Sequence, residues 1–105
     1  MKTRYLLILA SLFAASGSAV AADGAALAQK ANCLGCHAEA QKKVGPSFKD
    51  IAAKYKDDKG AQATLEKKVR NGGSGSWGKT PMPLTPAAFS DADIKTMVQW
   101  VLSHK

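Results

Sequence analysis

The chain has 105 residues, with 15 lysines and arginines against 8 aspartates and glutamates, so its net charge is +7 at neutral pH. This length allows one small domain, and a domain of that size rarely holds together on its apolar core alone. The two cysteines lie three positions apart, and a disulfide between them would close too small a loop to stabilise a domain. A metal or cofactor is therefore expected to support the fold.

Residues 1–22 have the layout of a secretory signal peptide. Two early cations precede an apolar run over residues 5–15, and small residues lead from there to the end of the segment. The run is too short to span a bilayer. Cleavage after Ala21 or after Ala22 fits the pattern, and we expect it near Ala22 because Asp23 begins a clearly different composition. The exported domain, residues 23–105, has 13 Lys and Arg against 8 Asp and Glu, a net charge of +5.

Cys33, Cys36 and His37 form the pattern C-x-x-C-H, which is the attachment pattern for a c-type haem. Each thiol can add across one haem vinyl group, and the histidine that follows is then held beneath the iron as an axial ligand. Zinc is a weaker alternative, because a closed zinc site needs four ligands and only His37 and His104 accompany the thiols. A thioredoxin-like thiol pair would need a β-α-β context. One covalent haem is the predicted cofactor.

The sequence predicts four helices and no convincing strand. The first, residues 25–32, is short and rich in alanine. In the other three, apolar residues recur every three or four positions, the spacing of an amphipathic helix. Asn71 and Gly72 tolerate the left-handed conformation that ends the third helix, and Ser90 is a suitable N-cap for the last. The apolar repeats of these three helices cover residues 48–55, 61–69 and 94–102. The predicted fold class is all-α, with short helices around a flat apolar cofactor.

Residues 73–80 match the phosphate-binding loop pattern G-x-x-x-x-G-K-[ST]. Such a loop follows a strand and leads into a helix, whereas here a charged helical segment precedes it and Pro81 follows. Nucleotide binding is therefore not expected. Nucleic acid is also a poor partner for an exported domain whose single arginine is Arg70.

The second axial position has few candidates. Met82 lies between Pro81 and Pro83, in a segment that cannot be the interior of a helix, and the prolines stiffen the loop. Met97 lies on the apolar stripe of the last helix and is expected to fill the core. His104 is expected to be a solvated chain end. We therefore predict Met82 as the second iron ligand, in the Met/His arrangement of cytochromes c.

The two tryptophans have different expected roles. Trp100 lies in the last helix and is expected to pack against the first one. Trp77 lies in a loop, where its indole N–H either donates to a haem propionate or belongs to an ordinary loop anchor.

These motifs, in this order, resemble a small bacterial class I cytochrome c of the cytochrome c-551 kind, also called cytochrome c8. The resemblance covers essentially all of residues 23–105 and implies an all-α fold around a covalent haem with His37 and Met82 as axial ligands. It further implies that the Pro46 carbonyl accepts a hydrogen bond from the His37 ring and that Trp77 donates to a propionate. The motifs that carry it are Cys33-x-x-Cys36-His37, Val44-Gly45-Pro46, Asn71-Gly72-Gly73, Trp77-Gly78, Pro81-Met82-Pro83 and Trp100-Val101-Leu102-Ser103.

The chain departs from the family pattern in two places. Where some relatives have an arginine on the inner propionate, this chain has Lys68, with Arg70 two positions later, and the partner is open between them. The segment after Met82, residues 83–89, is longer than in some relatives and lacks the asparagine that in them braces the methionine.

The residues and the resemblance together indicate a one-electron shuttle rather than an enzyme. It would work in the periplasm, between respiratory partners such as a cytochrome bc1-type donor and a terminal oxidase or nitrite reductase. A haem enzyme or gas sensor is the alternative, and it needs an open iron position, which Met82 argues against. The sequence also places no distal acid or base for peroxidase chemistry. A subunit of a larger complex is a third possibility.

Redox partners are expected to dock at the exposed haem edge. The net positive charge suits acidic partner proteins, because a charged patch steers their encounter. The expected surface has an apolar centre and a basic rim, on a monomer that is not embedded in a membrane. The apolar residues are Leu34, Val44, Pro81 and Pro83, and the basic residues are Lys42, Lys43 and Lys79.

Overall fold

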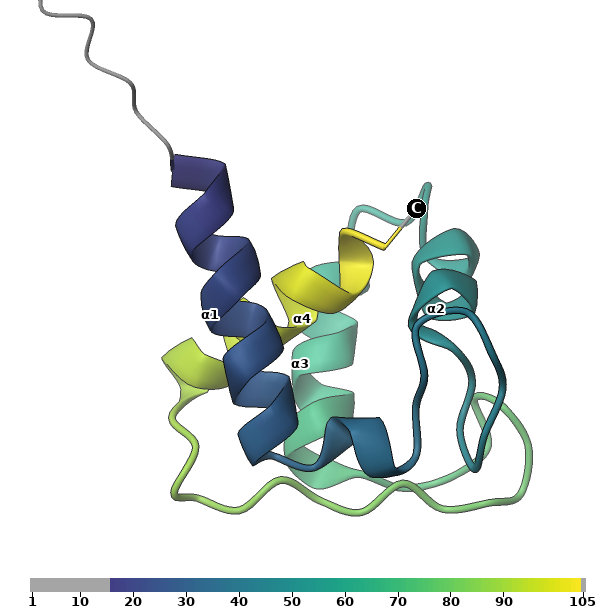
Figure 1. The fold of residues 1–105 in the computed structure, drawn as a ribbon. Helices are drawn as coiled ribbons and strands as arrows, with labels where there is room; N and C mark the ends of the chain where they lie inside the picture. The colour runs from purple at the N-terminus through teal and green to yellow at the C-terminus, as the bar shows by residue number, and fades with distance from the viewer. Residues whose placement is uncertain (1–15, 105) are drawn as a thin grey trace, which may run out of the picture.

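The computed structural model describes residues 16–104, and this part of the chain is all-α, as predicted (Figure 1). A single turn of 3-10 helix, η1, lies between the first two helices. Within residues 16–104 the only β-type pairing is an isolated antiparallel bridge between Gly73 and Met82. None of the described helices is long and apolar enough to cross a membrane. The elements are α1 (Ser16–Lys30), η1 (Cys33–Gly35), α2 (Phe48–Lys54), α3 (Ala61–Asn71) and α4 (Asp91–Leu102).

The first helix is longer than predicted. α1 begins at Ser16 instead of residue 25 and runs without a break through Ala22 and Asp23, where cleavage is expected. The predicted start was wrong because the helix continues back through residues 19–22, three of which are alanine, the strongest helix former. α1 also ends two residues early, since Asn32 takes the left-handed conformation with φ 62°. The rest of the predicted signal peptide lies outside the described residues.

The core forms around α4, which packs against α1, α2 and α3. Its apolar stripe meets the stripes of α2 and α3, as the helical spacing predicted. Met97 is 2% exposed within this cluster, which confirms its predicted place in the core. Each large apolar side chain buried in this way contributes roughly 1.5–3 kcal/mol to the stability of the fold. The buried cluster consists of Phe48, Ile51, Leu65, Ile94, Met97 and Val98.

α1 and α4 cross at Gly24. A Cβ at this position would collide with the Cβ of Trp100, so the crossing depends on a residue without a side chain. Trp100 thus packs against the first helix, as predicted. Its ring also meets the Phe48 ring edge-on, with centroids 4.9 Å apart.

His104 is not the solvated chain end that the sequence suggested. Its ring is partly buried, 5.3 Å from the Phe48 ring and 4.5 Å from the Trp100 ring. Its Nδ1 lies 2.8 Å from the Trp100 carbonyl oxygen. The expectation failed because the turn continues past the end of α4, where the His104 N–H donates to the Val101 carbonyl and carries the ring back onto the core.

Serine residues are the N-caps of two of the helices. Ser47, which is fully buried, accepts from the Asp50 N–H at the start of α2. Ser90 accepts from the Asp93 N–H, and the Asp93 carboxylate accepts from the Ser90 N–H, which makes a reciprocal capping box. These caps satisfy amide donors that have no partner within the first turn of a helix.

The capping box of α4 should contribute measurably to stability. We expect Ser90→Ala to lower the free energy of unfolding by about 1 kcal/mol, because it removes an N-cap acceptor. Ser90→Thr keeps the hydroxyl and should lower the free energy of unfolding much less. Ser74→Ala, in an exposed loop, should change it very little. Denaturant unfolding followed by circular dichroism measures all three, and an equal loss in the Ala and Thr variants would contradict the role of the cap.

Candidate haem-binding site

A cavity of about 640 Å³ lies between η1, α2, α3, α4 and the loop that follows α3. This volume falls within the range of cofactor sites. Its walls are largely apolar and include Ile51, Leu65, Val69 and Val98. The cavity brings together all six residues that the sequence assigned to the haem, from chain segments almost fifty positions apart. They are Cys33, Cys36, His37, Pro46, Trp77 and Met82.

The two thiols are placed by η1. The amides of Cys36 and His37 both donate to the Cys33 carbonyl, over 3.2 and 2.9 Å, so the C-x-x-C-H segment forms one tight turn. Both cysteines are free and partly buried. Burial raises the pKa of the Cys33 thiol. A backbone hydrogen bond opposes this shift, and the neighbouring Cys36 adds to it. The turn therefore presents two thiols and an imidazole to one cavity.

His37 is fixed by its surroundings. Its Nδ1 lies 2.6 Å from the Pro46 carbonyl oxygen, which is the contact that the family resemblance implies. An N–H at Nδ1 donates in this contact, which leaves the lone pair on Nε2. The ring stacks on Phe48, with centroids 5.6 Å apart. Gly45 lies so close that a Cβ there would be 2.6 Å from the ring Cε1.

The backbone of Met82 is held against the C-terminal end of α3. Its N–H donates to the Gly73 carbonyl over 2.8 Å, and its carbonyl accepts from the Gly73 N–H over 2.9 Å. Three residues later the Thr85 N–H donates to the Val69 carbonyl. Gly72 allows this close approach, because its φ is +68° and a Cβ would collide with the Met82 carbonyl oxygen.

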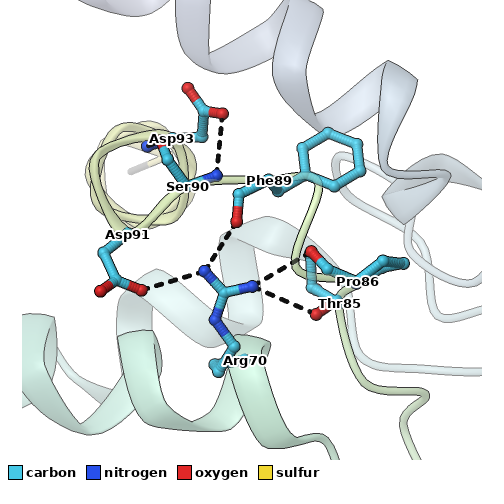
Figure 2. A network of polar contacts seen from close by, with 7 residues as sticks. All are labelled: Arg70, Thr85, Pro86, Phe89, Ser90, Asp91 and Asp93. Carbon is cyan, nitrogen blue, oxygen red and sulfur yellow. Dashed lines mark hydrogen bonds and ion pairs between the residues drawn. The ribbon is translucent and has the colours of Figure 1, made fainter.

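The structure separates the two candidate propionate partners. Lys68 lines the cavity and Arg70 does not. The Arg70 guanidinium instead donates to main-chain carbonyls of the loop after Met82 and to the Asp91 carboxylate (Figure 2). Of the two candidates, Lys68 is therefore the one whose position gives access to the cavity.

Sequence reasoning missed Lys54. Its Nζ lies 4.4 Å from the centroid of the Trp77 ring and donates to the Ser76 carbonyl over 2.9 Å. Trp77 itself lines the cavity and is 43% exposed. A cation in this position helps to hold the Trp77 ring in place by cation–π attraction. The helical spacing could have indicated Lys54, because it lies three residues after Ile51 and therefore on the same side of α2. Ile51 lines the cavity.

The predicted docking residues are all exposed. Most of the apolar ones line the cavity, as does Lys42, whereas Leu34 does not. Leu34 is joined to the basic rim because the Lys43 Nζ donates to its carbonyl over 3.1 Å. Lys79 is exposed and does not line the cavity. Leu84, which is 64% exposed, is a further apolar surface residue that was not predicted.

Gly72 offers a test of how tightly the Met82 segment is docked. Gly72 and Gly75 both have positive φ, but only Gly72 has atoms where a side chain would lie. We expect Gly75→Ala to cost about 1 kcal/mol of unfolding free energy through backbone strain. Gly72→Ala should cost roughly 2 kcal/mol more, because it also displaces the Met82 carbonyl. Equal losses in denaturant unfolding would mean that this contact is not tight.

Comparison with known proteins agrees with this geometry. The family model described as Cytochrome c matches residues 21–105. Cytochrome c-551 of Azotobacter vinelandii is 48% identical over 82 residues, which cover 78% of this chain and 98% of that protein. Cytochrome c-552 of Nitrosomonas europaea is 45% identical across the full length of both chains. The crystal structure of the wild-type Nitrosomonas protein matches with a TM-score of 0.71 at 48% identity, covering 77% of this chain and 99% of that one.

The donor set fits the cofactor of this family. Two free thiols and an imidazole on one tight turn, facing an apolar cavity, provide what covalent attachment of a c-type haem requires. The chain therefore belongs to the cytochrome c family, as a small class I member of the cytochrome c-551 type that carries one covalently bound haem and transfers single electrons.

Proposed function

We propose that this cytochrome shuttles single electrons in the periplasm, with His37 and Met82 as the axial ligands of the haem iron and Cys33 and Cys36 as its thioether attachments. The observation that carries the proposal is that His37 and Met82 line the same cavity and are each fixed by hydrogen bonds of 2.6–2.9 Å. When bound, the haem supplies a one-electron couple between ferric and ferrous iron. The signal-peptide pattern of residues 1–22 supports the location.

His37 has the features of a well-oriented ligand. The Pro46 carbonyl holds the proton on Nδ1, so the ring has one tautomer and its Nε2 is left to bind the iron. The stacked Phe48 ring and the close approach of Gly45 leave the ring little freedom to rotate. His37 would therefore stay in one orientation in both oxidation states.

Met82 contributes a soft thioether, a weak iron ligand that raises the reduction potential. A weak bond persists when the ligand has little freedom to leave, and the paired hydrogen bonds to Gly73 limit that freedom. With His37 and Met82 filling both axial positions, electron transfer would need no bond to be made or broken. This favours a carrier over an enzyme or gas sensor, which needs an open position.

The propionate end of the site is basic. Trp77 is the proposed hydrogen-bond donor to a propionate, and Lys68 and Lys54 are the proposed compensating charges. Cations placed near a carboxylate stabilise its ionised form, so the propionates would remain charged at neutral pH.

Both methionines of the predicted mature domain line the cavity, so the ligand assignment needs a direct test. We expect Met82→Ala to lose the weak far-red sulfur-to-iron band of the oxidised protein, and its reduced form to bind carbon monoxide. Met97→Leu removes the other sulfur with little change in volume and should keep the band and exclude the gas. Absorption spectra of the purified variants decide between them. Loss of the band in Met97→Leu alone would overturn the assignment of Met82.

The proposed partners are acidic redox proteins that dock where the haem edge meets the exposed apolar residues. The lysines of the rim would steer encounter, because opposite charges accelerate association at low ionic strength. The net positive charge also disfavours self-association, which supports action as a monomer.

Charge reversal tests this surface. We expect the triple variant Lys42→Glu, Lys43→Glu and Lys79→Glu to slow electron transfer to an acidic partner by roughly tenfold or more at low salt, with the difference shrinking as salt rises. Three other exposed lysines, Lys49, Lys56 and Lys59, do not line the cavity, and their reversal makes the same change in net charge. Stopped-flow rates measure both variants. Equal slowing would indicate a net-charge effect and count against this docking surface.

A further inference from the structure

Arg70 makes a set of contacts that neither haem binding nor partner docking explains. Its guanidinium donates to the carbonyls of Thr85 (3.3 Å), Pro86 (3.1 Å) and Phe89 (2.7 Å), and to the Asp91 carboxylate (3.0 Å). Figure 2 shows these four acceptors around one planar group that projects from α3. One side chain thus joins α3, the loop that leads to α4, and the first residue of α4.

The loop itself has few backbone hydrogen bonds. Residues 83–89 contain no helix or strand, and of the three carbonyls that Arg70 contacts only that of Pro86 accepts a backbone N–H, from Phe89. The Arg70 side chain is 28% exposed, whereas the Asp91 side chain is 99% exposed. The ion pair with Asp91 is exposed and therefore contributes little to holding the loop. The hydrogen bonds to the three carbonyls carry the interaction, and their charged donor makes them stronger than neutral ones.

These contacts lie close to Met82 along the chain. Upstream, Met82 is paired with Gly73. Downstream, only Pro83 and Leu84 separate it from Thr85, whose N–H is bonded to Val69 and whose carbonyl is bonded to Arg70. The position of Met82 is therefore fixed from both sides, and Arg70 supplies most of the side-chain bonds on the downstream side.

We propose that Arg70 is a positioning residue for Met82. It holds the returning arm of the ligand loop on α3 and so keeps the thioether from leaving the iron. It would do the work of the bracing asparagine that this chain lacks. The inference rests on the proposed ligation by Met82. The guanidinium suits this role because it stays charged at all accessible pH and its planar fork reaches several acceptors at once.

The test measures how readily Met82 leaves the iron. Imidazole is a neutral ligand that binds the oxidised holoprotein only after the thioether has dissociated, and the loss of the far-red band follows its binding. We expect Arg70→Gln to bind imidazole at least about tenfold faster than the wild type, since even one lost bond to a charged donor is worth that factor. Arg70→Lys keeps the charge but not the fork, so its rate should also rise, though less.

A control separates a local effect from general loss of stability. Leu27 lies on α1 and packs against the core without lining the cavity. Leu27→Ala should therefore destabilise the whole protein and leave the imidazole rate near that of the wild type. An equal rise in Leu27→Ala and Arg70→Gln would overturn the proposal, as would wild-type rates in both Arg70 variants.

The outcome also distinguishes this inference from the ligand assignment. If Met82 does not bind the iron, the wild type itself lacks the far-red band and the Arg70 variants do not differ from it. If the wild type has the band and the Arg70 variants keep it with unchanged rates, Met82 ligation stands and the positioning role of Arg70 fails.

Discussion

The C-terminal end of α3 is the part of the molecule on which the Met82 side of the site depends. The last carbonyls of a helix have no partner within the helix, and here they receive donors from the rest of the chain. The Lys68 carbonyl accepts from the Gly72 N–H, while those of Val69 and Arg70 accept from the Thr85 N–H. The end of the helix thereby serves as the docking point for the segment that carries Met82. The positive φ of Gly72 allows the chain to turn so that the two lie together.

The two proposed iron ligands are positioned in different ways. His37 belongs to a short segment, and its partners Gly45, Pro46 and Phe48 lie within eleven residues of it. Met82 is held almost entirely through main-chain atoms. Its pairing with Gly73 also spans nine residues, but the segment that follows it is bonded through Thr85 to Val69 and Arg70 of α3, about fifteen residues earlier. A local arrangement survives small shifts between helices, whereas the Met82 arrangement requires α3 and α4 to be correctly packed. The Met82 side should therefore be the first to loosen when the packing of α3 against α4 is disturbed.

Local patterns in the sequence predicted most of the fold. C-x-x-C-H, the helical spacing of apolar residues and the Ser90 cap each arise from near neighbours, and the structure contains the corresponding turn, helices and capping box. The start of α1 was misjudged because alanine propensity extends the helix beyond the segment with an apolar face. The position of His104 was misjudged because it depends on Phe48 and Trp100, which only tertiary packing brings near. For the same reason, the sequence did not show which of Lys68 and Arg70 lies at the cavity. Both are cations on one helix, and only tertiary packing determines which groups each of them contacts.

The contacts of Arg70 within the loop go to carbonyl oxygens, which every amino acid possesses. The side chains at positions such as 84, 87 and 88 are exposed and take no part in them. Evolution can therefore vary the composition of this loop while the arrangement persists, provided that its length and path are kept. Among descendants of this chain, such an interaction would let the residues of the loop vary. It would require an arginine to be kept at position 70.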